Sequence, residues 1–270
     1  DDDDDDEVGE DGEGYGVPGT EDWANDVATL WGELEAAIKA PELNVPALSG
    51  ALGMALSALE TEVGSMAPGQ DTPLDALPPL VGTLAENLGT VLEVLERVPP
   101  AVPTQKGGHA QPAVGSHRVG AAEVVARLLQ IGNTAVTARV LESGAVKRVA
   151  DMVFEYPWNN SFQGAASRIL QSCFAGASGW GPGVLEGDDG LLKQLAAAGE
   201  VAVEQPPGSR LGHMGHVIRL SNMLVDLTSQ GDETVSSAAE GCAEWGVFTG
   251  EGGALDRLNE QQEGDLGGTR

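Results

Sequence analysis

Two histidines, His213 and His216, stand three residues apart, a spacing that can place both imidazoles on one face of a helix. Imidazole nitrogens bind zinc and other transition metals, so this pair is the first candidate for a metal site. No cysteine or aspartate pair at a familiar ligand spacing completes the set, and two ligands do not make a site. We therefore interpret the pair as part of a helix start and expect neither a metal nor another cofactor.

A glycine pattern near the amino end matches a dinucleotide fingerprint only in form. Residues 14–19 fit G-x-G-x-x-G, but Pro18 lies inside the pattern, which follows an aspartate run rather than a strand. The neighbouring carboxylates would repel a pyrophosphate. The G-x-S-x-G motif of serine hydrolases does not occur, and neither Cys173 nor Cys242 adjoins a histidine. We therefore expect that the protein is not an enzyme.

The chain is strongly acidic, which excludes whole classes of partner. Its 270 residues carry 42 Asp and Glu against 14 Lys and Arg, a formal net charge of −28. Binding to nucleic acid or to an anionic membrane surface needs an excess of basic side chains instead. No apolar run approaches the roughly 20 residues that span a bilayer. Two cysteines are too few for a disulfide framework, so we expect a protein of the cytoplasm or the nucleus.

Hydrophobic periodicity predicts an all-α protein. Residues 1–22 hold 12 acidic side chains and no basic one, which predicts a disordered acidic tail. Apolar residues then recur at three- and four-residue steps through two helical blocks, 23–98 and 117–263. Between the blocks, residues 99–116 lack periodicity and are rich in Pro and Gly, which predicts a linker loop. Because the chain begins with Asp1 rather than Met, we expect a fragment of a longer protein.

Short helices joined by small turns favour stacked helical hairpins. Residues 141–174 fit one armadillo-type repeat of about 40 residues, with a helix that opens at 144–146 and a second helix that carries Ala165 and Ala166. In such an array each unit buries its apolar face against its neighbours. The predicted fold is therefore an armadillo/HEAT-like helical-repeat solenoid.

An aromatic turn, Tyr156-Pro157-Trp158-Asn159-Asn160, separates two of the predicted helices. Pro157 disfavours helix at Tyr156, and Asn159 or Asn160 can cap the helix that follows. Trp158 would then cover the corner between the helices, and we favour this structural interpretation because it explains every residue type. The alternative is that the corner presents a binding surface, since Trp and Tyr often dominate interfaces.

A local reversal of charge surrounds this turn. Between residues 115 and 171, six basic residues outnumber four acidic ones, although the chain as a whole is acidic. The segment is either a docking surface for an acidic partner or an ordinary solvated helix face, and the sequence leaves both interpretations open.

Two short motifs resemble the SAPS-domain family, the regulatory subunits of protein phosphatase 6. The first motif is 154–160, and the second is Gly212-His213-Met214-Gly215-His216, where family members usually have Tyr in place of the first histidine. The likeness spans about residues 45–268. The upstream half of the family's domain has no counterpart here, and the segment 185–200 lacks the family's Cys-Lys pair. The likeness continues through His117, Arg118, Gly132, Asn133, Arg219, Asn222, Trp245, Phe248 and Asn259, and weaker similarity covers residues 48–60 and 74–100.

The resemblance implies a non-catalytic helical scaffold that binds the catalytic subunit of a Ser/Thr protein phosphatase and directs it to substrates. Ankyrin-repeat subunits would be further partners, and the metals would belong to the phosphatase. The alternative is an armadillo-like adaptor that binds other acidic or helical peptides without any phosphatase. The residues expected to contact the partner are Tyr156, Pro157, Trp158, Asn159, Asn160, Gly212, His213, Met214, Gly215, His216, Arg219, Arg118, Lys147 and Arg148.

Overall fold

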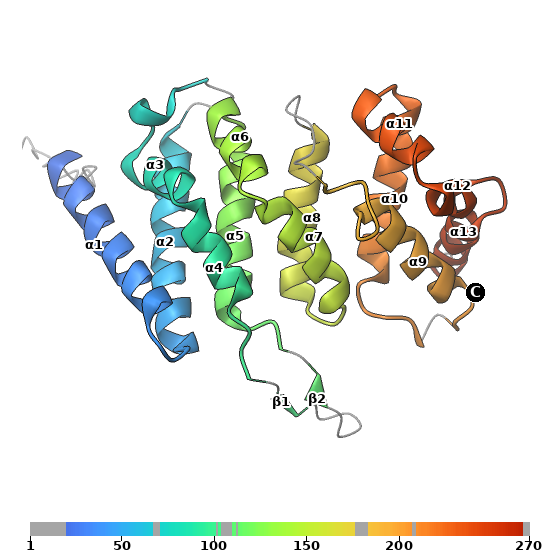
Figure 1. Cartoon of the computed structure of the whole chain (residues 1–270), viewed down its shortest axis with the longest axis horizontal. Coiled ribbons are helices and arrows are strands. Elements are labelled where there is room, and N and C mark those ends of the chain that lie inside the picture. The colour runs from blue at the N-terminus through green and yellow to red at the C-terminus, as the bar shows by residue number, and fades with distance from the viewer. Residues whose placement is uncertain are drawn as a thin grey trace, which may run out of the picture.

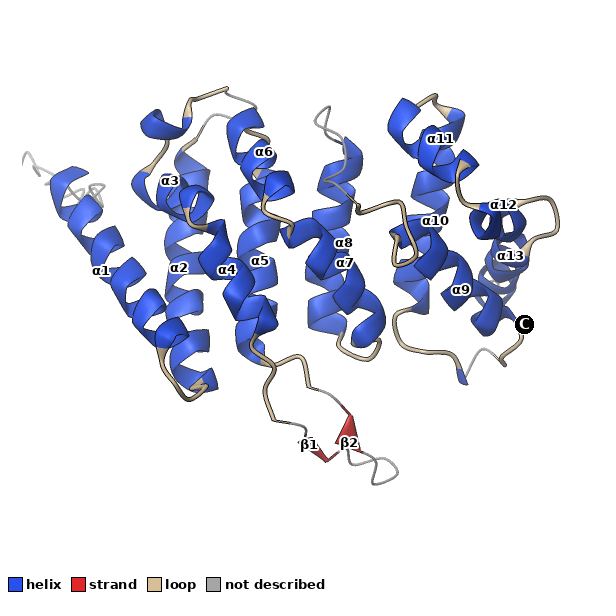
Figure 2. Cartoon of the chain, viewed as in Figure 1, coloured by secondary structure: helices blue, strands red, loops and turns tan. Residues whose placement is uncertain are grey.

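The protein is built of helices that pack side by side, as a computed structural model of residues 20–66, 71–100, 102–103, 110–111, 113–175, 183–206 and 209–266 shows (Figures 1 and 2). Two short strands, β1 (Val102–Pro103) and β2 (Ala110–Gln111), pair antiparallel. The predicted all-α class is confirmed. The helices are α1 (Thr20–Lys39), α2 (Val45–Ser65), the 3₁₀ turn η1 (Leu74–Ala76), α3 (Pro79–Glu86), α4 (Leu88–Glu96), α5 (Ser116–Gln130), α6 (Thr134–Glu142), α7 (Ala145–Glu155), α8 (Asn160–Ala175), α9 (Leu191–Val203), α10 (Met214–Ser229), α11 (Glu233–Glu240), α12 (Ala243–Thr249) and α13 (Ala254–Leu266).

The helices form two layers along one row (Figure 1). In the first layer, α1, α2, α5, α8 and α10 each pack on the next. In the second layer, α3, α4, α6, α7 and α9 cover one face of that row, and α11 to α13 close the end beside α9 and α10. A hydrophobic core runs without interruption from Val27 in α1 to Leu258 in α13. Each amphipathic helix therefore buries its apolar stripe against neighbours in both layers.

Local signals in the sequence set most helix ends. The Asn133 carboxamide caps α6 by accepting a hydrogen bond from the Val136 N–H at 3.0 Å, and Asp232 caps α11 through the Val235 N–H at 2.9 Å. Gly144, between α6 and α7, has a φ of +82°, a left-handed conformation that only glycine adopts without cost. The start of α7 at Ala145 confirms the predicted helix that opens at 144–146.

Two stretches with continuous apolar spacing, 77–95 and 235–245, each contain a break between two helices. The stripe from Leu77 to Leu95 breaks at Asn87, whose side-chain amide donates to the Thr83 carbonyl at 2.8 Å while its backbone leaves helical geometry. The stripe from 235 to 245 breaks between α11 and α12, and Cys242 lies at the N-cap of α12 rather than inside a helix. Periodicity alone missed both breaks because the apolar spacing continues across them.

The predicted segment boundaries differ slightly from the structure. Of the predicted acidic tail, residues 1–19 lie outside the described residues, and Thr20 already belongs to α1. Helix α5 begins at Ser116, which the prediction placed in the linker. Because α5 packs on α2 and α4, the two predicted helical blocks share one core. None of the described helices combines the length and the apolar character needed to cross a membrane.

A buried carboxylate joins three of the helices near the amino end. Glu62 of α2 is 6% exposed and accepts the backbone N–H groups of Leu80 and Val81, at 3.0 and 2.9 Å, in the first turn of α3. It also accepts the indole N–H of Trp23 in α1 at 2.6 Å. A carboxylate in this position supplies the acceptor that the first turn of a helix lacks and opposes the positive end of the helix dipole.

Candidate functional site

The two motifs of the sequence analysis meet in space. The Phe154 ring contacts the His213 imidazole edge to face, with ring centroids 5.9 Å apart. Gly212 lies against the turn between α7 and α8: a Cβ atom there would be 2.9 Å from Cε3 of Trp158 and 3.1 Å from the Pro157 carbonyl oxygen. Glycine at 212 is therefore required for this close approach. These five residues, Phe154, Pro157, Trp158, Gly212 and His213, are called the corner below.

Short-range hydrogen bonds shape the turn at 156–160. Tyr156 leaves helical geometry at the end of α7, as Pro157 requires. The Asn159 carboxamide accepts the Phe162 N–H at 2.8 Å, so Asn159 is the cap of α8 and Asn160 its exposed first residue. Sequence analysis missed Gln163, which is buried in α8 and donates to the carbonyls of Val153, at 2.8 Å, and Tyr156, at 3.1 Å.

The prediction that Arg118 contacts a partner is wrong, because its side chain is fully buried. Its Nε donates to the Leu95 carbonyl, in the last turn of α4, at 2.6 Å. Its Nη1 donates to the Tyr156 hydroxyl at 2.6 Å, and the guanidinium lies over the Tyr156 ring, 4.9 Å from the centroid. The planar guanidinium satisfies a carbonyl at a helix end and holds the tyrosine in place. Arg118 and the buried Tyr156 therefore support the corner from within.

The other basic residues of the 115–171 segment are ion-paired within the chain. Lys147 contacts Asp151 at 2.5 Å, and Arg148 contacts Glu96 at 2.7 Å and Glu155 at 2.6 Å. These contacts neutralise the positive charge that the sequence suggested for an acidic partner, so Lys147 and Arg148 do not form a free basic surface. The remaining pairs are Arg127–Glu60, Arg139–Glu142 and Arg168–Glu123.

Both histidines of the second motif favour the neutral form. His213 is only 2% exposed, and its Nδ1 has no hydrogen-bond partner among the described residues. Burial, together with the nearby His216, lowers the pKa of His213 to about 4. His216 shares a 2.6 Å hydrogen bond with the Ser167 hydroxyl, and burial and Arg219 lower its pKa too. The described residues contain no group of three or more His, Cys, Asp or Glu side chains that could hold a metal ion.

Packing explains most of the remaining residues that carry the resemblance. Met214 is buried at the start of α10, while Gly215 faces open space and needs no special backbone freedom. Arg219 is exposed and donates to the Gln171 carboxamide at 3.4 Å. Asn222 and Asn259 form a reciprocal pair of amide hydrogen bonds, at 2.9 and 3.0 Å, between α10 and α13.

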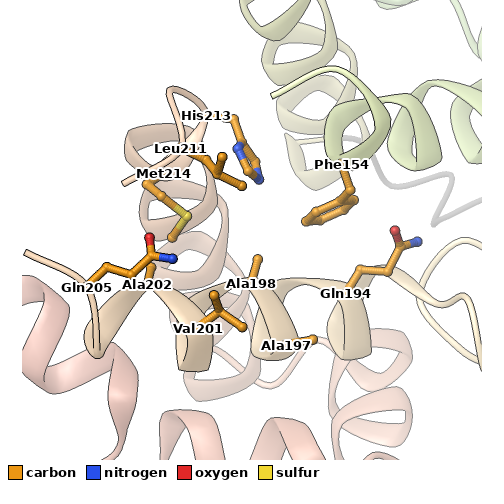
Figure 3. A pocket seen from close by; sticks show the side chains of 10 residues that line it. All are labelled: Phe154, Gln194, Ala197, Ala198, Val201, Ala202, Gln205, Leu211, His213 and Met214. Carbon is orange, nitrogen blue, oxygen red and sulfur yellow. The ribbon is translucent and has the colours of Figure 1, made fainter. Parts of the chain in front are cut away.

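An apolar hollow opens beside the corner (Figure 3). Its volume is about 320 Å³, and the side chain of His213 points into it from one wall while Ala198 and Val201 of α9 form the opposite one. Gly199, on the buried face of α9, leaves the space that the Phe248 ring fills, and this packing positions the α9 wall. The lining residues are Phe154, Gln194, Ala197, Ala198, Val201, Ala202, Gln205, Leu211, His213 and Met214.

Exposed apolar side chains gather around this apolar hollow. Among the described residues, six large hydrophobic side chains are exposed, and three of them are Trp158 at 55%, Val201 at 59% and Leu211 at 41%. Val201 and Leu211 line the hollow, and Trp158 packs on Gly212 next to Leu211. Gathered exposed apolar side chains mark an interaction site more often than scattered ones do. Sequence analysis missed Val201, although its place off the apolar stripe of α9 was a usable signal.

Comparison of the chain with protein-family models, with curated proteins and with solved structures finds no match. The corner and the apolar hollow are therefore interpreted from the residues of this chain alone.

Proposed function

We propose that the protein is a non-catalytic scaffold that binds another protein through the corner and the apolar hollow. The observation that carries the proposal is the gathering of Trp158, Val201 and Leu211 at the place where the two motifs meet. Removing such side chains from water contributes about 25 cal/mol per Å² of apolar area, before the entropic cost of association is subtracted. Trp is also the residue type most enriched among those that dominate binding energy.

The proposed partner is the catalytic subunit of a Ser/Thr protein phosphatase of the protein phosphatase 6 type. The support is the resemblance of residues 154–160 and 212–216 to the SAPS-domain family, together with the contact between these two segments. In this function the chain directs the phosphatase to substrates, with ankyrin-repeat subunits as further partners. We place the complex in the cytoplasm or the nucleus, a proposal that fits the two free cysteines, Cys173 and Cys242.

The proposed architecture is an armadillo/HEAT-like solenoid. Successive groups, α2 with α3 and α4, α5 with α6 and α7, and α8 with α9, each place one helix in the first layer and the rest in the second. The repeat predicted at 141–174 contains α7 and α8, one helix of each layer, and therefore joins the last helix of one group to the first helix of the next. The corner lies at the same edge of this stack as the α1–α2 and α4–α5 connections (Figure 1).

Co-purification of the tagged full chain with a phosphatase catalytic subunit tests the proposal. Trp158→Ala should reduce the recovered phosphatase by about tenfold or more, because it removes the largest exposed side chain of the corner. Met54→Ala is the matched control, since Met54 is 51% exposed but lies on α2. Equal recovery with wild type and both variants would refute the corner as the contact. Charge reversal at Lys147 and Arg148 is a poorer test because it breaks intramolecular ion pairs.

The second candidate function is an adaptor that binds other peptides without a phosphatase. The observation that favours it is the open apolar hollow, which suits a peptide side chain from any partner. This candidate would be supported if a different protein, and no phosphatase, were recovered with the wild-type chain and if Trp158→Ala abolished that recovery.

A further inference from the structure

A second hollow of opposite character adjoins the apolar hollow. The second one shares Phe154 and Gln194 with the first and is also lined by Asp151, Glu155 and Asp189. It is called the acidic hollow below. A ligand that extends across Phe154 and Gln194 therefore meets apolar walls at one end and carboxylates at the other.

Negative charge is in excess around the acidic hollow. Two basic side chains, Lys147 and Arg148, face the carboxylates of Asp151 and Glu155, and Arg148 is shared with a further carboxylate, that of Glu96. Together with Asp189, four carboxylates stand against two basic groups. The excess attracts a cation and repels an acidic peptide.

Asp189 is the carboxylate best placed to receive that cation. Its backbone carbonyl accepts hydrogen bonds from Lys147 at 3.2 Å and Gln194 at 2.7 Å, which fix the position of the residue. Its side chain is exposed and makes no hydrogen bond or ion pair with any described residue. A basic side chain can therefore bind there without displacing an existing partner.

One wall of the apolar hollow is the His213 imidazole, which points into it (Figure 3). The residue is only 2% exposed, and its Nδ1 is unpaired within the described part of the chain. Leaving a buried polar atom unpaired costs free energy. Because this nitrogen is closed off from solvent, a molecule in the hollow meets the imidazole through its ring, and the hollow suits an apolar side chain.

We propose that the apolar hollow receives a large apolar side chain of a partner's peptide segment, while the acidic hollow binds a Lys or Arg of the same segment. The inference rests on the protein-binding function proposed above, but not on the phosphatase as the partner. It also reverses the charge that the sequence suggested: the fitting partner is a basic and apolar segment rather than an acidic one.

Selection from a library of short random peptides on the immobilised full chain tests the proposal. Enriched peptides should pair a large apolar residue with Lys or Arg and should bind more weakly at high salt. Val201→Glu should weaken these peptides by about tenfold or more, and Asp189→Lys by about threefold or more. The matched controls are Val247→Glu, at a valine that is 70% exposed on α12, and Asp75→Lys, at an exposed aspartate in η1.

Three results would overturn the proposal: no enrichment, enriched peptides without a basic residue, or peptides that bind Val201→Glu and Asp189→Lys as well as wild type. The phosphatase proposal fails separately. Peptide binding with the expected variant pattern but no phosphatase co-purification would refute only the phosphatase. Phosphatase binding that Trp158→Ala abolishes, while Val201→Glu and Asp189→Lys leave it unchanged, would overturn only the inference about the hollows.

Discussion

Mild acid should destabilise this protein through His213. The imidazole is 2% exposed, its Nδ1 has no partner among the described residues, and burial holds its pKa at about 4. In the unfolded chain the same group has an ordinary pKa near 6.5. Between these two pH values the unfolded chain binds a proton that the folded protein does not. The contribution of the neutral His213 to the free energy of unfolding is therefore complete above about pH 6.5 and is lost as the pH falls towards 4.

The size of this effect follows from the two pKa values. Between about pH 7 and pH 5, a group with a pKa near 6.5 unfolded and about 4 folded reduces the free energy of unfolding by about 2 kcal/mol. His213→Phe removes the titration but keeps an aromatic ring for the edge-on contact with Phe154. Between pH 7 and pH 5, the free energy of unfolding of the variant should therefore fall by about 2 kcal/mol less than that of wild type.

Urea unfolding followed by far-ultraviolet circular dichroism measures both proteins at the two pH values. Burial also lowers the pKa values of His117 and His216, and both remain in the variant, so the difference between the proteins isolates His213. An equal pH dependence in wild type and His213→Phe would refute the argument that a buried, neutral His213 supports the corner.

Three further substitutions test the contacts around the corner and the core. Gly212→Ala should destabilise the protein by about 1 kcal/mol and weaken partner binding, because the new Cβ displaces the Trp158 indole packed on it. Gly215→Ala, in open space, is the control and should stabilise α10 slightly, so thermal unfolding distinguishes the two variants. Tyr156→Phe should cost about 2 kcal/mol in urea unfolding, since it leaves a buried guanidinium donor of Arg118 unpaired, and an unchanged midpoint would contradict that role. Glu62→Ala should cost about 2–4 kcal/mol and loosen the start of α3, detected as faster amide hydrogen exchange there; protection equal to that of wild type would be inconsistent with the cap.

Helix positions were predictable because their signals are local. The apolar stripe of α1 stops before Pro41, and Gly132 with Asn133 ends α5 and caps α6, as their residue types indicate. The break at Asn87 was not predictable from periodicity, since the apolar spacing runs through it. The sequence could also not decide which asparagine caps α8, because Asn159 and Asn160 are equally suited by type.

The residues of the corner could be singled out from the sequence, but the contact between the two motifs could not be predicted from it. Sequence analysis singled out 154–160 and 212–216 separately, and it favoured Trp158 as the cover of the corner between two helices. Trp158 packs on Gly212 from the second motif and remains 55% exposed. Arg118 was expected to contact the partner, but the Leu95 carbonyl and the Tyr156 hydroxyl give it hydrogen-bond partners inside the core. The phosphatase as partner remains a prediction.

The sequence by itself determined the helical class, most helix ends and the acidic character of the chain, because periodicity, caps and charge act over a few residues. Only the tertiary structure decided which charges are neutralised, which apolar side chains stay exposed and where two hollows adjoin. Those properties depend on helices far apart in the chain: α9 supplies Val201, the turn before α10 supplies Leu211, and α7 supplies Phe154. A side chain's exposure and ion pairs are set by the neighbours that packing brings to it, and no local pattern specifies those neighbours.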